Sequence, residues 1–158
     1  MPTKTTAQSG AWSAGSTWVG GVIPSDGDDI VIAAGHTLTF DADLSAWTLG
    51  MGNMTITGAP NGSTPGRFTV SEVPGTYVLK IGNGKTIQGT HSSYNQGQFH
   101  IGTSVNPYPY ECEFQLVSVG GNTTMINHTW LDMQVFCDMP PLESRYAILT
   151  ADVPSGTD

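Results

Sequence analysis

Apolar and polar residues alternate along this chain in short runs that are separated by Gly, Asn, Pro or Asp. Alternation with a period of two is typical of half-buried β-strands, and no segment shows the three-to-four-residue apolar period of a helix. The pattern therefore predicts an all-β protein. The runs are DIVIA (29–33), TLTFD (37–41), WTLG (47–50), MTITG (54–58), RFTVS (67–71), YVLKI (77–81), KTIQG (85–89), GQFHIG (97–102), ECEFQLVSV (111–119), TWLDMQVF (129–136) and YAILTADV (146–153).

The spacing of these runs leaves two architectures open. The early runs begin seven to thirteen residues apart, which is consistent with either a β-sandwich or a parallel β-helix. Two features favour the β-helix: the strands are short, and the turns are not the two-residue Asn-Gly or Asp-Gly loops of hairpins. No strict repeat is visible, so periodicity alone leaves the sandwich as the alternative.

Composition narrows the class of protein and its partners. Twenty glycines, ten prolines and 38% hydrophobic residues indicate a turn-rich folded domain. The formal charge of −8, with only five lysines and arginines, argues against nucleic acid and anionic membranes as partners. No stretch is long and apolar enough to insert into a bilayer. The first ten residues lack the apolar core of a classical signal peptide.

The segment 11–41 differs from the rest of the chain. It places Trp12 and Trp18 among glycines, continues through an acidic turn, and only then begins to alternate. It resembles the start of the eight-glycine domain, a family module found in cell-surface hyaluronidases, fibrocystin-like proteins and bacterial proteins. The matching residues are Trp12, Ser13, Thr17, Trp18, Gly20, Gly21, Pro24, Gly27, Asp28, Asp29, Ile30, Val31, Ile32, Gly35 and Asp41, and a second family signature matches FHIGTSVNPYPYECEFQLVSVGG at 99–121.

The resemblance implies a right-handed parallel β-helix whose first coil is closed by this N-terminal segment. An open end of a β-helix exposes its core, and two tryptophans are large enough to cover it. The expected cap consists of Trp12, Trp18, Gly20, Gly21, Pro24 and Gly35. We expect one β-helical domain over 1–158, with the cap and first coil in 1–41 and further coils in 42–158. The weak match after residue 121 predicts that the chain is the N-terminal part of a longer protein.

Candidate ligand sites are sparse. Asp26, Asp28 and Asp29 could hold calcium through their oxygens, although acids and glycine are also what a tight turn needs. No other cofactor is expected. The paired acids Glu111 and Glu113 are interpreted as a solvated strand start rather than a glycosidase pair.

Aromatic, histidine and cysteine residues add a few hypotheses. Tyr94, Tyr108 and Tyr110 lie in polar or proline-rich loops, where their rings could stack on sugars or pack a loop onto the coil. The four histidines do not fall in a metal-ligand spacing, and the alternation points His100 away from the core. Cys112 and Cys137 are interpreted as buried small residues, with a disulfide as the alternative.

These observations predict a structural, ligand-presenting module rather than an enzyme. The expected setting is a phage tail or host-recognition protein, or a bacterial surface protein, located on a virion or outside the cell. Carbohydrate is the ligand class considered, and other partners would be copies of the chain or other virion or surface proteins. The alternative is the N-terminal portion of a polysaccharide-degrading, hyaluronidase-like enzyme whose active site lies elsewhere.

Overall fold

The computed structural model describes residues 1–90, 95–110, 112–117, 126–127 and 131–135. Two single-turn 3-10 helices, η1 (Gly15–Thr17) and η2 (Val19–Gly21), are the helical elements of this part of the chain, which includes no helix able to span a membrane. Everything else regular is β-structure. The strands are β1 (Thr3–Thr5), β2 (Gly10–Ala11), β3 (Asp29–Ile32), β4 (Thr37–Phe40), β5 (Met54–Ile56), β6 (Arg67–Val70), β7 (Tyr77–Ile81), β8 (Ile87–Gly89), β9 (Gly97–Ile101), β10 (Cys112–Leu116), β11 (Ile126–Asn127) and β12 (Leu131–Val135).

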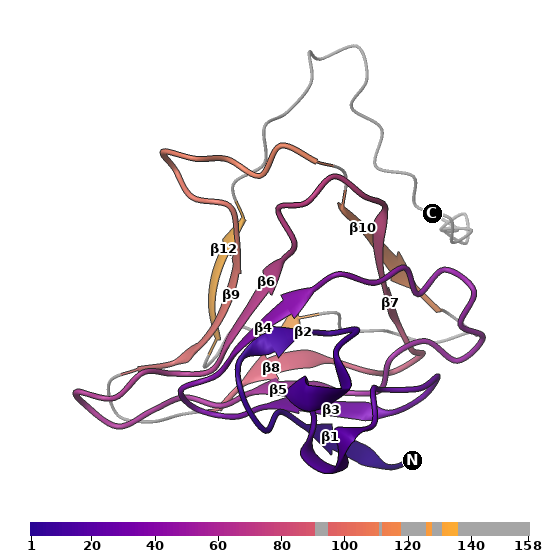
Figure 1. Cartoon of the computed structure of the whole chain (residues 1–158), viewed down its shortest axis with the longest axis horizontal. Helices are drawn as coiled ribbons and strands as arrows, with labels where there is room; N and C mark the ends of the chain where they lie inside the picture. The colour runs from indigo at the N-terminus through magenta and orange to yellow at the C-terminus, as the bar shows by residue number, and fades with distance from the viewer. Residues whose placement is uncertain (91–94, 111, 118–125, 128–130, 136–158) are drawn as a thin grey trace, which may run out of the picture.

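The strands form three sheets that are the walls of a β-solenoid of about three turns (Figure 1). The first sheet has the order β1-β3-β5-β8-β11, the second has the order β12-β9-β6-β4-β2, and the third pairs β7 with β10. Every strand pair between these elements is parallel. The predicted parallel β-helix is therefore confirmed, and the sandwich is wrong because its strands would pair mainly antiparallel.

The register between strands stacks equivalent side chains of successive coils on one another in the interior of the solenoid. In the first sheet Ile30 pairs with Met54, and Met54 pairs with Ile87. All three are fully buried. In the second sheet Phe68 pairs with Phe99, and their rings stack with centroids 4.6 Å apart and planes 7° from parallel. Each rung buries its inward side chains against the next, so strands of three to five residues suffice.

The cap covers the N-terminal end of this core. Trp12 and Trp18 are 3% and 2% exposed, which confirms that they are buried. The Trp18 indole Nε1 donates to the Trp12 carbonyl oxygen at 2.8 Å, and the two rings meet edge to face at 5.4 Å. The Trp12 ring also lies edge to face with Phe40 of β4, at 5.3 Å. The tryptophan pair thus continues the aromatic core of the second sheet.

The backbone of the cap needs its glycines. A Cβ atom on Gly15 would lie 2.7 Å from the Gly21 carbonyl oxygen, so the chain can fold back on itself only without a side chain there. Gly20, Gly21 and Gly35 have φ of 81°, 72° and 81°, a region that favours glycine. Pro24 is buried at the end of the same segment.

Ser13 and Asp41 tie the cap to β4. The Ser13 backbone N–H donates to Asp41 Oδ1 at 2.9 Å, and the Ser13 hydroxyl donates to Asp41 Oδ2 at 2.6 Å. Both residues belong to the predicted opening signature. Their contact explains why an acid follows the strand at 37–40.

Most predicted runs became strands, with informative exceptions. WTLG (47–50) is not a strand: the Asp26 carboxylate accepts from the backbone N–H groups of Thr48 and Leu49, and Gly50 turns at a φ of 71°. Strands β1, β2 and β11 were not predicted, because β1 contains no apolar residue and β2 and β11 are two residues long. The run at 146–153 lies outside the described residues.

We predict that Trp12→Ala and Trp18→Ala each lower the free energy of unfolding by about 3–5 kcal/mol, because each removes a large buried aromatic side chain. Thermal melts of the whole chain measure the effect. Val19→Ala is the matched control in the same segment, since Val19 is 62% exposed, and we expect a change within about 0.5 kcal/mol. Melting temperatures of both tryptophan variants close to that of the Val19 variant would contradict the cap.

A second prediction concerns pH. Hydrogen bonds from the backbone and side chain of Ser45 hold the pKa of the exposed Asp43 below its ordinary value. A lowered folded-state pKa stabilises the fold above the unfolded value of about 3.9 and loses that contribution as pH falls through the folded value. Asp43→Asn should therefore cost a small amount of stability at pH 7 and nothing near pH 2. An equal cost at both pH values would contradict this assignment.

Candidate functional site

The three acids considered for calcium each bind backbone amides. Asp26 accepts from Thr48 and Leu49, and the Asp28 Oδ2 atom accepts from the Ser25 N–H at 2.9 Å. The Asp29 Oδ1 atom accepts from the Asn53 N–H at 2.7 Å. Within the described residues no group of three or more acidic, histidine or cysteine side chains could hold a metal ion. The structure thus gives these acids turn and inter-coil roles and does not assemble them into a calcium site.

The tyrosines considered for sugar stacking have different fates. Tyr108 is 2% exposed, and its hydroxyl donates to the Ser71 carbonyl oxygen at 2.8 Å. For Tyr108 the structure agrees with the second of the two alternatives, in which the ring packs its loop onto the coil. Tyr110 packs edge to face on Tyr108 with centroids 5.8 Å apart, and its binding role stays a prediction. Tyr94 lies outside the described residues.

The remaining sequence candidates also have structural surroundings. Cys112 is half-buried on β10 and packs against the hydrophobic core, while Cys137 lies outside the described residues. Glu113 accepts a hydrogen bond from the Gln115 side chain at 3.1 Å on the outer side of β10. Glu111 is not among the described residues.

The outer face of the second sheet carries a cluster of polar residues. Arg67 and Thr69 of β6, Gln98 and His100 of β9, and Asp132 and Gln134 of β12 alternate with the inward-facing residues of these strands. We call these six residues the polar face. Register aligns Arg67 with Gln98 and Gln98 with Asp132, and it aligns His100 with Gln134. The cluster is thus built from three coils.

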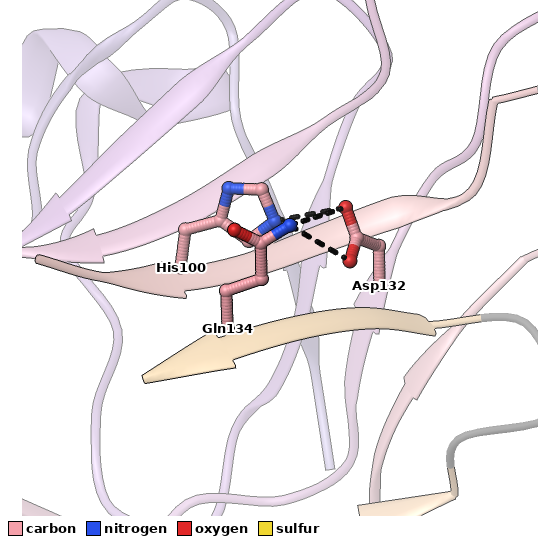
Figure 2. A network of polar contacts seen from close by, with 3 residues as sticks. All are labelled: His100, Asp132 and Gln134. Carbon is pink, nitrogen blue, oxygen red and sulfur yellow. Dashed lines mark hydrogen bonds and ion pairs between the residues drawn. The ribbon is translucent and has the colours of Figure 1, made fainter. Parts of the chain in front are cut away.

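Three members of the polar face form a hydrogen-bonded network (Figure 2). The His100 Nε2 atom lies 3.0 Å from Asp132 Oδ2, and the Gln134 amide nitrogen donates to Asp132 Oδ1 at 3.3 Å. The His100 side chain is 12% exposed, whereas the Asp132 side chain is 40% exposed. The less exposed His100 ring thus contacts the Asp132 carboxylate on its protein side, while the carboxylate remains accessible to solvent.

A polar hollow of about 200 Å³ adjoins this network and is lined by Asn95, Gln96, Gln98 and Asp132. The Asn95 side chain is anchored, because its amide nitrogen donates to the Ser63 carbonyl oxygen at 2.7 Å. The side chains of Gln96 and Gln98 form no hydrogen bond within the described part of the chain. Two unengaged amides and one solvent-facing carboxylate therefore surround the hollow.

A second hollow, of about 320 Å³, lies at the corner between the third and first sheets. Its lining includes Gly27, Gly50, Gly52 and Gly82, together with the apolar side chains of Met1, Leu49, Met51 and Val117. It offers few groups that could orient a polar ligand. The polar face is the better candidate site.

The chemistry of the polar face suits the recognition of hydroxyl groups. An amide can both donate and accept, and a carboxylate accepts, so neighbouring hydroxyls of a polyol can each find a partner. Glycoside hydrolysis uses two facing acids, and among the residues that the structure describes one acid, Asp132, lines the hollow. Within the described residues the His100 ring is hydrogen-bonded only to Asp132, so no nucleophile is coupled to it.

Comparison with known protein families identifies the family of this chain. The family model described as the G8 domain matches residues 17–134, which is well over half of the chain; the match begins after Trp12 and includes the core coils and the polar face. The chain belongs to the G8 domain family. This confirms the family to which the opening segment was assigned by resemblance. Searches of curated proteins and of solved structures returned no match to this G8 domain.

Sequence reasoning missed the polar face of the G8 domain. The alternation correctly placed His100 outward between Phe99 and Ile101, which are each 1% exposed. His100 pairs with Asp132 because the strand register aligns residues 32 apart in the sequence. The sequence has no strict repeat from which this separation could be predicted. An outward acid in the alternating run at 129–136 was the one signal available.

Proposed function

We propose that this G8 domain is a non-catalytic carbohydrate-binding module that recognises sugar hydroxyls on its polar face. The observation that carries the proposal is the hollow in which the unengaged Gln96 and Gln98 amides and the Asp132 carboxylate converge. Ligand sites use a few well-placed polar groups to orient the ligand. Gln98 and Asp132 lie on β9 and β12, and Gln96 directly precedes β9, so these groups need little reorganisation on binding.

The Asp132 carboxylate is the centre of the proposed site. His100 and Gln134 hold it in place from one side, which leaves acceptor positions directed to solvent. A hydrogen bond to an ionised acceptor is stronger than a neutral one. Asp132 would therefore accept from one or two sugar hydroxyls, while Gln98 and Gln96 would donate to and accept from their neighbours.

The proposed biological setting is a phage tail or host-recognition protein, or a bacterial surface protein, on a virion or outside the cell. The resemblance of the opening segment to modules of surface proteins supports this setting. In such a protein the β-helix would be the structural support that presents the polar face to glycans. Other copies of the chain or other surface proteins would be its assembly partners.

We predict that Asp132→Ala and Gln98→Ala weaken glycan binding about tenfold or more, as expected for the loss of hydrogen bonds that include a charged group. Binding is measured with a panel of immobilised oligosaccharides and then by calorimetry on those that bind. Melting temperatures should change little, because both side chains lie on the outer side of the sheet.

Matched controls on the other two walls separate the polar face from general surface effects. Gln88→Ala removes an outward glutamine of β8 in the first sheet, and Glu113→Gln neutralises an outward acid of β10 in the third sheet. Both controls should bind glycans as the parent does. Equal losses in controls and site variants, or no binding by the parent to any oligosaccharide, would refute the proposal.

The hyaluronidase-like alternative is tested with the same protein. Hyaluronan and bacterial capsular polysaccharides are incubated with the parent chain, and the products are separated by size. We expect the polysaccharides to keep their length. Release of oligosaccharides that disappears in the Asp132→Ala variant would show that the polar face is catalytic.

A further inference from the structure

Asn61 lies in an exposed turn and is followed by a glycine. Of the seven asparagines in the chain, two precede a glycine, namely Asn61 before Gly62 and Asn83 before Gly84. A backbone nitrogen can attack the side-chain amide of the asparagine before it. Glycine has no Cβ atom to hinder that approach. The two Asn-Gly pairs are therefore the positions where side-chain amide loss meets the least steric resistance.

The surroundings of Asn61 leave both reacting groups free. Asn61 and Gly62 are exposed, and a Cβ atom on Gly62 would meet no other atom within 4 Å. Within the described residues neither the Asn61 side chain nor the Gly62 backbone N–H forms a hydrogen bond. Water can therefore reach the attacking nitrogen and the amide that it attacks.

The turn from Pro60 to Ser63 is a weak restraint on this reaction. The Ser63 backbone N–H donates to the Pro60 carbonyl oxygen at 3.0 Å, and Gly62 has a φ of 81°, as the third residue of a type II turn requires. Ring closure needs a rotation of the Asn61 backbone that opens this hydrogen bond. Exposed turns open locally without unfolding of the core, so the folded protein can reach the reactive conformation.

The second pair, Asn83-Gly84, lies in a similar turn with closer packing. The Lys85 backbone N–H donates to the Gly82 carbonyl oxygen at 3.1 Å. Gly82 is buried, and a Cβ atom on it would lie 2.7 Å from a backbone oxygen of the preceding coil. Residues 60–64, in contrast, are all exposed. We therefore expect the reaction to be faster at Asn61 than at Asn83.

We propose that Asn61 is a site of spontaneous deamidation, and that its conversion to isoaspartate alters the wall of the polar hollow. The Gly62 nitrogen loses its proton to hydroxide and bonds to the Asn61 Cγ atom. The Cγ–Nδ2 bond then breaks, and ammonia leaves with a proton taken from water. Water adds to the resulting succinimide ring, giving aspartate by cleavage at the side-chain carbonyl and isoaspartate by cleavage at the main-chain carbonyl. One water is consumed and one ammonia is released, so no oxidant or reductant is needed.

The contacts of Asn95 connect this turn to the polar hollow. The Asn95 side-chain nitrogen donates to the Ser63 carbonyl oxygen at 2.7 Å and to the Pro60 carbonyl oxygen at 3.4 Å, and Asn95 lines the hollow. Isoaspartate adds one carbon to the main chain between these two carbonyls and replaces a neutral amide by a carboxylate. The two carbonyls then lose the spacing that a single amide nitrogen bridges, so the Asn95 side chain is released.

The modification is measured on the full chain. The protein is incubated in alkaline and in mildly acidic buffer and digested, and each asparagine peptide is followed by mass spectrometry, with isoaspartate identified by an isoaspartyl methyltransferase. We expect the Asn61 peptide to convert severalfold faster than the Asn83 peptide, to give both isoaspartate and aspartate, and to react faster in alkaline buffer, because the deprotonated nitrogen attacks. Asn61→Gln is the matched control, since its amide could close only a larger, slower-forming ring. An Asn61 peptide that keeps its amide while Asn83 reacts, or that yields aspartate alone, would overturn the proposal.

Hydrogen exchange tests the effect on the hollow. The Ser63 N–H closes the turn, and the Ala59 N–H donates to the Asn95 carbonyl oxygen at 2.8 Å. Both amides should exchange severalfold faster in incubated than in fresh protein, while the amides of β4 and all amides of Asn61→Gln stay unchanged. Asn61→Asp adds the charge without the extra main-chain carbon and should resemble fresh protein. Equal exchange in fresh and fully converted protein would overturn the effect on the hollow. None of these measurements uses a glycan, so the result is independent of the proposed function.

Discussion

Parallel hydrogen bonding between successive coils is the constraint on which the rest of this domain depends. It fixes which residues, some thirty positions apart, share a rung. In the interior of the solenoid it stacks the Phe68 ring on the Phe99 ring, with centroids 4.6 Å apart. It also brings the coils so close that a Cβ atom on Gly97 would lie 2.2 Å from the Ile56 carbonyl oxygen, so glycine is required where the first and second sheets approach each other.

A stacked core has ends, and the N-terminal end of this one is covered by aromatic side chains. The tryptophan pair bonds to itself through the Trp18 indole and the Trp12 carbonyl, and it packs on Phe40 below. The buried polar atom of the indole is thus satisfied within the cap. The same segment is pinned to β4 by Ser13 and Asp41, so the cap belongs to the first coil in both packing and hydrogen bonding.

Side chains on the outer faces of the sheets do not have to pack against the next coil, so polar residues can be placed there. On the second sheet the register gathers an arginine, a histidine, an acid and amides from three coils. Hydrogen bonds from His100 and Gln134 occupy some of the acceptor positions of the Asp132 carboxylate, and its other acceptor positions are directed outward. The proposed ligand recognition depends on this ladder. Of the aromatic rings that the sequence offered for sugar stacking, Tyr108 packs its loop onto the coil.

The sequence by itself determined the class of fold, most strands and the family. Period-two alternation reports which side chains face inward, and that signal is local, so the run YVLKI at 77–81 became a strand with exactly those bounds. The tryptophan and glycine pattern is likewise local and identified the cap. Tertiary structure alone decided the pairing of His100 with Asp132 and the burial of Tyr108. These depend on coil lengths that vary from turn to turn, and without a constant repeat the register between distant residues cannot be read from the sequence.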